Sequence, residues 1–360
     1  MENNMVHIDG SVLEGGGQIL RMAVAFSVLL QTPIKISRIR LSRQKPGLTP
    51  QHHKGIEIVC EMTGGKAFGA EERSTELTFY PGHVKGGEYL AAIRTAGSIS
   101  LLTQLLLPCA LFASGETVID LRGGTNCEMA PHIDYTATVL LRLLAKFGAI
   151  FDYKIDRRGF FPKGGGRVIL HTKPVKILNA VDLSDPGKLS RIWGTVFTAG
   201  NYNSHNGENI KKGAMDVFRK TFPEVRSDIK VVEEDPNKTI GSACGISVFG
   251  ETTSGCVFGH SELGHRNVHP NKTGADVASV LCGDIWIGGC VDEYLQDQAI
   301  IYMALANGVS KILSGPITLH TETAIYVAER MTKAKFTISD HPSGVKLIQC
   351  TGIGLINKNI

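Results

Sequence analysis

The sequence lacks the short motifs that identify several common classes of site. Its eight cysteines include no CxxC pair, which argues against a zinc ribbon or a disulfide framework and favours a reducing, intracellular setting. There is also no GxxxxGK(S/T) P-loop, no GxSxG nucleophile elbow and no HExxH zinc motif. Any chemistry that the chain performs must therefore rest on other residues.

Long apolar runs are missing as well. The longest, Ile99–Ala113, is interrupted by polar residues and by Pro108 and is too short to span a bilayer. We therefore expect it to form a buried helix, and we expect no membrane partner. The N-terminal MENNMVHIDGS contains no signal-peptide core. The 360 residues are 42% hydrophobic and 20% charged, which is ordinary for a globular protein of two or three domains.

Strong net charge is the third absence, because +4 alone is too little to indicate nucleic-acid binding. The distribution of the charge is more informative. Residues 35–54 (KISRIRLSRQKPGLTPQHHK) hold six Lys or Arg and no acid. Such a block gives a local positive potential that attracts phosphates. A solvated basic loop is the alternative interpretation.

Clusters of glycine separate segments with helical and β-like patterns. Three of them lead into expected helices at Ile19–Leu30, Ala91–Ala113 and Tyr294–Ala306. Each helix is followed by a β-rich run, a loop, a second helix and another β-like stretch; the second helices are expected near Ile56–Met62, over Ala137–Phe147 and up to Met331. The pattern predicts a mixed α/β (α+β) fold with one unit repeated three times in tandem.

A histidine lies at the start of each second helix, at His52, His132 and His320, and the two spacings are unequal. They are 80 and 188 residues, which predicts an insertion before the third unit, from about 181 to 275. We expect residues 1–180 and 276–360 to form the three-unit domain. The insert has a helix-like stretch and two β-like runs and should form a separate small α/β domain.

These three histidines are the best candidates for chemistry in the residue pattern. A helix N-terminus offers free N–H groups and a partial positive charge, which suit a phosphate and disfavour imidazolium. A neutral imidazole there can accept a phosphoryl or nucleotidyl group. A surface or packed histidine is the ordinary alternative, and the pattern alone does not say which of the three reacts.

Three other patterns give weaker hypotheses. EGGGQILR lacks the glycine spacing of a dinucleotide fingerprint and is better explained as a tight turn. HIDG resembles a KxDG nucleotidyl-lysine motif with His in place of Lys, but it lies in an expected first strand. His260, His265 and His269 are spaced loosely like metal ligands, although no acid or cysteine pattern completes the set, so a polar loop is favoured.

Six long segments together make the chain resemble the RNA 3′-terminal phosphate cyclase family over nearly its whole length. They are DGSVLEGGGQILR (Asp9–Arg21), RLSRQKPGLTPQHHKG (Arg40–Gly55), GGTNCEMAPHIDYT (Gly123–Thr136), FFPKGGGRV (Phe160–Val168), VDEYLQDQ (Val291–Gln298) and LHTETA (Leu319–Ala324). The resemblance implies three units, each with two helices and a four-stranded sheet, plus a small inserted domain.

The resemblance also implies a reaction. His320 would attack the α-phosphorus of ATP to form a covalent histidine–AMP, AMP would pass to the 3′-phosphate of an RNA end, and the 2′-hydroxyl would close a 2′,3′-cyclic phosphate. Mg²⁺ or Mn²⁺ would assist, and the partner would be an RNA with a 3′-phosphate end. No obligate protein partner is inferred. The resemblance to eukaryotic members suggests the nucleus (nucleoplasm), the cytoplasm or both.

Family site residues carry over by position. The implied ATP contacts are Gln104, Pro131, Tyr294, Asp297, Gln298 and His320; the implied phosphate or RNA-end contacts are Arg21, Arg40, Arg43, Gln51 and His52; and Glu14 is the candidate metal ligand. Two rival functions remain: a non-catalytic cyclase-like protein of ribosome assembly, and an enzyme that adenylylates 5′-phosphate ends. The LHT and VDEYLQDQ segments favour the cyclase.

Overall fold

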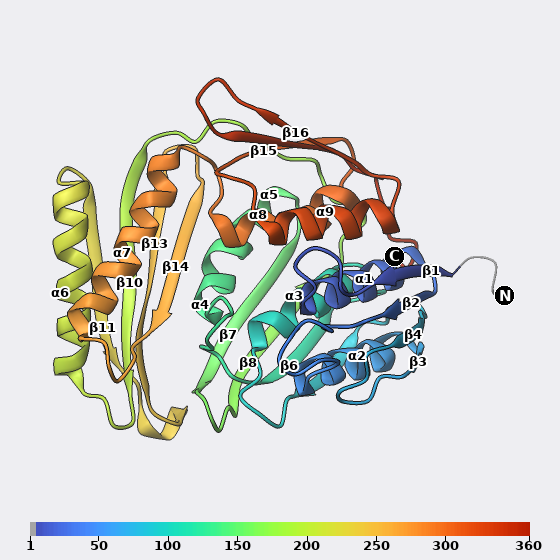
Figure 1. Cartoon of the computed structure of the whole chain (residues 1–360), viewed down its shortest axis with the longest axis horizontal. Coiled ribbons are helices and arrows are strands. Elements are labelled where there is room, and N and C mark those ends of the chain that lie inside the picture. Colours follow the sequence, from blue (N-terminus) through green and yellow to red (C-terminus); the bar gives the residue numbers. More distant parts are fainter. Residues whose placement is uncertain (1–4) are drawn as a thin grey trace.

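The computed structural model describes residues 5–360, and they form a mixed α/β fold built from four small sheets (Figure 1). The predicted fold class is therefore confirmed. The first sheet has the strand order β1-β2-β4-β3. Its elements are β1 (Val6–Asp9), α1 (Gly17–Leu30), β2 (Ile34–Ser37), α2 (Pro50–Thr63), β3 (Lys66–Phe68) and β4 (Leu77–Tyr80).

The second sheet has the order β12-β7-β8-β6-β5. Its elements are β5 (Gly87–Ala92), α3 (Ile99–Leu111), β6 (Thr117–Gly123), α4 (Ile133–Tyr135), a π-helical turn (Thr136–Leu140), α5 (Leu141–Lys146), β7 (Ile150–Gly159) and β8 (Gly166–Lys173). The short strand β12 (Thr239–Ile240) joins it from far along the chain.

The third sheet has the order β16-β17-β15-β9. Its elements are β9 (Asp182–Leu183), α8 (Glu293–Leu305), β15 (Val309–Ser314), α9 (Leu319–Met331), β16 (Lys335–Asp340) and β17 (Lys346–Thr351). In all three sheets the first strand pairs in parallel with the second, and two antiparallel strands follow. Three repeats would produce this shared topology, and the tandem repeat itself stays a prediction.

The fourth sheet lies at the left of Figure 1, with α6 and α7 beside it. Its order is β11-β10-β13-β14. Its elements are β10 (Leu189–Ala199), α6 (Ser204–Thr221), β11 (Arg226–Glu233), a 3₁₀ turn (Pro236–Lys238), β13 (Ala243–Thr252), β14 (Val257–Leu263) and α7 (Pro270–Ile287). The predicted boundary at 275 falls inside α7, and β9, just after the boundary at 181, pairs with β15 of the third sheet. The division into two domains stays a prediction.

Helices α1, α3, α8 and α9 pack against one another between the sheets. Helix α3 (ISLLTQLLLPCAL) is apolar on nearly every side and almost wholly buried, as a central helix requires. Helices α1 and α9 lie side by side, and their N-terminal ends carry Gln18 and His320, whose side chains meet. The core thus aligns the helix ends where the candidate residues lie.

The expected helix Ala91–Ala113 is wrong in its first turns. Residues Gly87–Ala92 form β5, paired with β6, and the helix begins only at Ile99. Ser98 sets this start because its hydroxyl accepts a hydrogen bond from the Leu101 N–H at 3.2 Å. The glycines of Lys85–Gly87 therefore lead into a strand, which the apolar pattern did not separate from the helix that follows.

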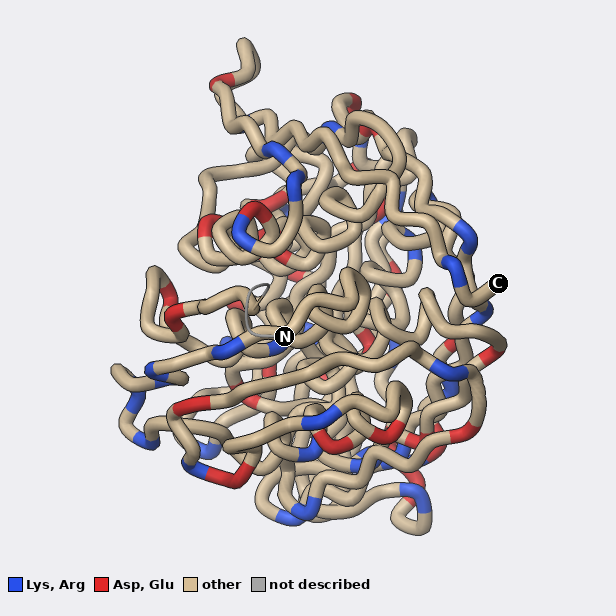
Figure 2. The backbone as a smooth tube through the Cα atoms, turned by 90° about the vertical axis from the view of Figure 1, so that its right-hand side faces the viewer, with Lys and Arg blue, Asp and Glu red and all other residues tan. Residues whose placement is uncertain are grey.

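Residues of both charge signs are dispersed along the chain. In Figure 2, segments with Lys or Arg alternate with segments of Asp or Glu, without one side of a single sign. Within residues 5–360, no helix combines the length and the apolar character needed to cross a bilayer.

Candidate active site

Gln18 lies at the centre of the candidate site, on the first turn of α1. Its side-chain Nε2 donates to Asp297 Oδ2 of α8 at 2.5 Å, and its Oε1 lies 3.3 Å from His320 Nδ1 of α9. Once Asp297 is ionised its carboxylate can only accept, so the amide turns its Nε2 toward Asp297 and its Oε1 toward His320. Oε1 must then accept from a protonated Nδ1, and the lone pair of His320 lies on Nε2.

His320 reaches this position because the preceding loop is held by hydrogen bonds. Thr318 caps α9, its Oγ1 accepting from the Thr321 N–H at 3.1 Å. The side chain of buried Gln296 accepts from the Thr318 N–H at 3.0 Å and donates to the Pro316 carbonyl at 3.2 Å. The imidazole is thereby placed at the first turn of a helix whose entry is fixed.

The surroundings of His320 keep its ring neutral. Partial burial lowers its pKa, Arg21 and Arg43 lower it further, and Glu293 opposes them in part. The residue is nevertheless exposed to solvent. His320 therefore presents a neutral, accessible nitrogen beside two cations, which suits attack on a phosphate.

His52 lies beside Gly17 and Arg21 of α1 and is buried. It caps the start of α2: its Nδ1 accepts from the Thr49 N–H at 3.2 Å, and Pro50 occupies the first turn. Its Nε2 is buried and has no partner among the described residues. A Cβ on Gly17 would come within 2.4 Å of that nitrogen, so glycine is required there. Burial, Arg21 and Arg40 lower the pKa of His52 to about 3.

Arg21 lies between two other predicted site residues, Gln104 and Asp297. Its Nε donates to Gln104 Oε1 of α3 at 3.2 Å. Burial lowers its pKa to about 10, against the attraction of Asp297, and the guanidinium keeps its charge at neutral pH. Burial raises the pKa of Asp297 to about 7, although Arg21 opposes the rise. The structure thus brings together Gln104, Arg21 and Asp297 around a cavity of about 30 Å³ that Gln18 and Gln298 also line.

Glu14 precedes α1 and faces Arg43. Its Oε1 forms an ion pair with the Arg43 guanidinium, and its Oε2 is buried without a partner among the described residues. Residues 5–360 contain no cluster of three or more His, Cys, Asp or Glu suited to a metal ion. Mg²⁺ commonly takes one or two carboxylates together with waters and substrate phosphates. The unpartnered Oε2 of Glu14 fits that mode, with the remaining ligands supplied by the substrate and water.

Arg40 and Gln51 hold the backbone near the site. Arg40 Nη1 donates to the Lys45 and Gly47 carbonyls at 2.9 and 2.8 Å, and so shapes the basic loop. Gln51 Oε1 accepts from the Ser98 N–H at 2.9 Å, which ties the start of α2 to that of α3. Both residues are half-buried, and in these contacts they position loops.

Tyr294 and Pro131 lie on the side of the site that faces the fourth sheet. The Tyr294 ring stacks on His260 of β14, with ring centroids 5.7 Å apart and planes 19° apart. Buried Asp292 caps α8 beside it and accepts from Tyr135 Oη at 2.6 Å. Pro131 is half-buried in the loop before α4. Gln298 turns back on its own helix, donating to the Tyr294 carbonyl at 2.7 Å.

His52, His132 and His320 have different environments, although the sequence pattern places each of them at the start of a helix. His132 is 2% exposed, packs edge-on against Phe197 and lies 3.4 Å from Ser247 Oγ through its Nδ1. Burial lowers its pKa to about 4. His52 is also enclosed, so only His320 is open to an incoming substrate. His265 and His269 lie on the exposed approach to α7, where His269 forms the N-cap.

Comparison with known proteins shows the family of the chain. Residues 12–338 match the family model described as RNA 3′-terminal phosphate cyclase. The chain belongs to this family. Curated relatives include an RNA 3′-terminal phosphate cyclase of Drosophila melanogaster, 37% identical over 99% of both chains. A probable RNA 3′-terminal phosphate cyclase of Dictyostelium discoideum is 39% identical over 96% of this chain and 82% of its own. One from Pyrobaculum aerophilum is 37% identical over 97% and 99%.

Two residues of this cyclase family member were not predicted as site residues. Gln18 joins Asp297 to His320, and Gln296 fixes the loop before His320. Both are buried glutamines on otherwise apolar helices, and a polar residue in such a place usually has partners. The two buried glutamines are visible in the segments EGGGQILR and VDEYLQDQ. Their hydrogen-bond partners are not, because the partners of Gln18 lie 279 and 302 residues away and Thr318 lies 22 residues after Gln296.

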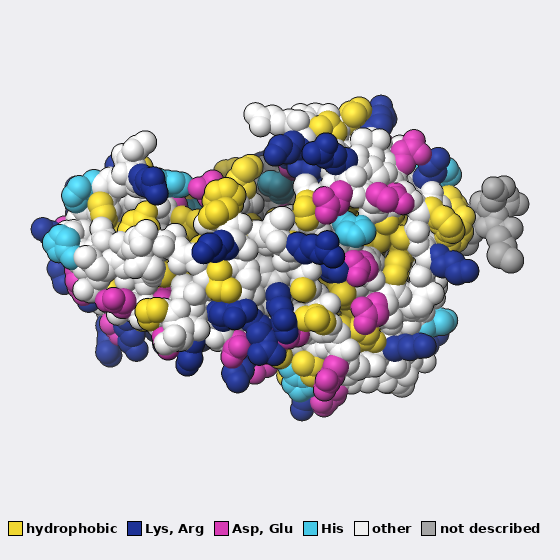
Figure 3. Space-filling view, turned by 90° about the horizontal axis from the view of Figure 1, so that it is seen from below, with side chains coloured by type: hydrophobic (Ala, Val, Ile, Leu, Met, Phe, Trp, Pro, Cys, Tyr) yellow, Lys and Arg dark blue, Asp and Glu magenta, His cyan; other side chains and the backbone are white. Residues whose placement is uncertain are grey.

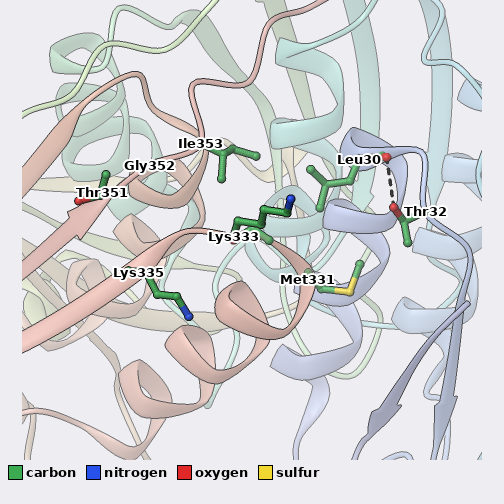
Figure 4. Close-up of a pocket in the computed structure, with 9 residues that line it drawn as sticks. Leu30, Thr32, Met331, Lys333, Lys335, Thr351, Gly352 and Ile353 are labelled. Carbon is green, nitrogen blue, oxygen red and sulfur yellow. Dashed lines mark hydrogen bonds between the residues drawn. The ribbon is translucent and has the colours of Figure 1, made fainter. Parts of the chain in front are cut away.

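A larger hollow of about 570 Å³ lies at the opposite ends of α1 and α9 (Figure 4). Met331 and Leu30 line it together with the exposed Lys333 and Lys335. Twelve residue steps of α1, about 18 Å at 1.5 Å per residue, separate Leu30 in its lining from Gln18. It has neither a histidine nor a carboxylate in its lining, whereas four predicted site residues (Arg21, Gln104, Asp297 and Gln298) line the smaller cavity.

Proposed function

We propose that this protein converts the 3′-terminal phosphate of an RNA to a 2′,3′-cyclic phosphate at the expense of ATP, through a covalent histidine–AMP on His320. One observation carries the proposal: His320 is the accessible histidine of the three, its Nδ1 is directed to Gln18, and two arginines lower its pKa. Membership of the cyclase family supports the reaction type.

In the first step His320 Nε2 attacks the α-phosphorus of ATP. A nitrogen–phosphorus bond forms, the bond to the bridging oxygen breaks, and pyrophosphate leaves with that electron pair. The charges of Arg21 and Arg43 act on His320, and in this proposal they stabilise the negative charge that develops on the phosphate oxygens. The proton stays on His320 Nδ1 and remains hydrogen-bonded to Gln18 Oε1. The imidazole becomes positively charged in this step, and the hydrogen bond keeps its orientation.

In the second step an oxygen of the RNA 3′-phosphate attacks the same phosphorus, and His320 leaves as a neutral imidazole. The RNA end now carries AMP in a phosphoanhydride.

In the third step the vicinal 2′-hydroxyl oxygen attacks the RNA phosphorus, loses its proton and displaces AMP. Adenylylation is needed because a bare phosphate monoester has a poor leaving group, and the 2′-hydroxyl reacts quickly because it is intramolecular.

A divalent cation, Mg²⁺ or Mn²⁺, belongs to this proposal. When bound it would neutralise phosphate charge, and Glu14 Oε2 is the carboxylate oxygen of the chain that would hold it. The paired Arg43 would then stay oriented toward the phosphates. On the other side, Tyr294 and Pro131 are the residues proposed to contact the base of ATP.

The test of the first step uses ATP labelled at the α-phosphorus and a divalent cation without RNA. The wild type should acquire an acid-labile, alkali-stable label, which should be missing from His320→Ala. His205→Ala, at an exposed histidine on α6, is the matched control and should label normally. An unlabelled wild type that still binds RNA would instead support the non-catalytic ribosome-assembly function.

The test of the substrate uses an RNA with a 3′-phosphate. It should become resistant to phosphatase only when ATP is present. An equal reaction of 3′-hydroxyl or DNA ends would refute cyclisation, because DNA has no 2′-hydroxyl. Accumulation of adenylylated 5′-phosphate ends with no cyclic product would identify the chain as a 5′-end modifying enzyme.

A further inference from the structure

The FFPKGGGRV segment has no role in the chemistry proposed above, yet it carries the most exposed aromatic ring of the chain. Phe161 is 80% exposed, more than any other Phe, Tyr or Trp among residues 5–360. Other exposed rings have an aromatic neighbour, as Phe68 has in Tyr80 and Trp286 in Phe222. No described ring packs against Phe161 in this way, and four-fifths of the residue is open to solvent.

The turn that carries Phe161 is firmly anchored. The preceding Phe160 is 1% exposed and stacks on Phe197, with planes 8° apart. The Gly164 N–H donates to the Phe160 carbonyl at 2.8 Å and closes the turn. Gly164 adopts a φ of +63°, and a Cβ there would lie 2.5 Å from the Thr95 carbonyl oxygen. The exposed ring therefore stands on a rigid base pressed against the loop before α3.

Two cations lie on the two chain segments that meet at this turn. Arg94, next to Thr95, and Lys163, two residues after Phe161, are both exposed. Within the described part of the chain neither forms an ion pair. The stretches 93–98 and 160–165 contain no acid. Figure 3 views the molecule from below, where dark-blue side chains gather across the middle of the face with yellow and magenta ones among them.

The loop of Arg94 is hydrogen-bonded to two segments that carry predicted site residues. The loop of Arg94 ends at Ser98, whose N–H donates to Gln51 Oε1 at 2.9 Å, and Gln51 is the neighbour of His52. On its other side, Cys127 Sγ contacts the Ala96 carbonyl at 3.2 Å, and the Cys127 loop continues to Pro131. The loop of Arg94 is therefore joined to two segments that carry predicted site residues, Gln51 and Pro131.

We propose that Phe161, Arg94 and Lys163 form a platform that binds the single-stranded RNA on the 5′ side of the reacting end, with a base stacked on Phe161 and phosphates on the two cations. This rests on the function proposed above. An exposed ring between unpaired cations is the combination that binds single strands without sequence preference: every base offers a π-face, and the backbone supplies the charge. The platform would anchor long substrates and leave the chemistry at His320 unchanged.

The experiment compares RNA substrates with a 3′-phosphate that are two or about ten nucleotides long. Phe161→Ala should raise KM for the long substrate about 5- to 150-fold, the effect of losing one stacked base. It should leave the dinucleotide and the labelling of His320 by ATP unchanged. Phe161→Tyr keeps the ring and should behave like the wild type. Phe68→Ala, at an exposed ring on β3, is the matched control.

The cations have their own readout. In Arg94→Ala/Lys163→Ala, binding of the long RNA should depend less on salt, with the slope of log affinity against log salt reduced by about 1.4 for two phosphate contacts. Lys333→Ala/Lys335→Ala, at the hollow of Figure 4, is the control and should keep the wild-type slope.

Equal effects on both RNA lengths, or none on the long one, would overturn the platform while leaving cyclisation intact. A wild type that fails to cyclise any RNA would overturn the proposed function instead. Equilibrium binding of the long RNA, measured by fluorescence anisotropy, would then still test the platform. Loss of ATP labelling in Phe161→Ala would also count against the platform, because it would show that the change acts through the histidine site.

Discussion

Replacing Gln18 by leucine tests the central feature of the site. Leucine has a similar size and helix propensity, so the buried first turn of α1 should still pack. The change removes the donor to Asp297 Oδ2 and the acceptor for His320 Nδ1. Asp297 then loses a hydrogen bond to its charged form, and His320 is no longer held in the tautomer with a free Nε2.

The magnitude follows from these two bonds. A hydrogen bond to a charged group contributes about 1.5–3 kcal/mol, and the bond to exposed His320 can be replaced by water. If losing the fixed orientation of the His320 ring raises the barrier to adenylylation by this amount, the rate should fall by about 10- to 150-fold. Stability should fall by about 1–3 kcal/mol, the cost of an unpartnered buried acceptor.

The assay is the rate of label transfer from ATP to the protein in a single turnover, together with urea unfolding. Thr103→Val is the matched control. It removes a buried hydroxyl that donates to the Ile99 carbonyl within α3 and accepts from Tyr153 Oη of β7. Neither hydrogen bond involves His320. It should lose about 1 kcal/mol of stability and keep the wild-type labelling rate.

The reasoning fails if Gln18→Leu labels as fast as the wild type while being destabilised. It also fails if Thr103→Val slows labelling equally, because the loss would then follow stability and not the orientation of His320.

Three further predictions concern pH and packing. Labelling by ATP should rise with pH through about 7, where Asp297 ionises and becomes a stronger acceptor for Gln18, and Asp297→Asn should remove that inflection from the pH profile. His52 has its pKa lowered to about 3, so the unfolded chain binds the extra proton between pH 6.5 and 3. Stability is therefore lost as pH falls, by up to about 1.4 kcal/mol per unit, and His52→Gln should flatten this slope in urea titrations at pH 7 and 5. Gly17→Ala should cost about 1–3 kcal/mol in thermal unfolding, because its Cβ would lie 2.4 Å from His52 Nε2; Gly283→Ala, with open space in α7, should be neutral or stabilising, and an equal loss in both would contradict the steric argument.

Local patterns in the sequence were enough to predict the α/β class and the helix entries at His52 and His320, although the second helix was expected near Ile56 and begins at Pro50. Thr49-Pro50 before His52 and Thr318 before His320 are capping patterns, and both helices begin where those residues stand. Hydrogen bonds of this kind span three residues or fewer, so they can be read from neighbouring letters. The start of α3 was missed because a short strand and a buried helix have the same apolar composition.

The tertiary structure alone decided how the three histidines differ. All three stand at helix entries, yet His52 and His132 are enclosed and His320 is open to solvent. Their exposure depends on packing against segments far away in the chain, such as Phe197 against His132. No local pattern contains that information.

The same reason separates what the sequence by itself determined from what needed the fold. Asp297, His320 and Gln18 are each visible as polar residues in helical segments, but their mutual contacts span 279 and 302 residues. Capping and amphipathic periodicity are local and act within one turn or one helix. Which helix ends meet is set by the packing of α1, α8 and α9 between the sheets, and only that packing turns three separate polar residues into one site.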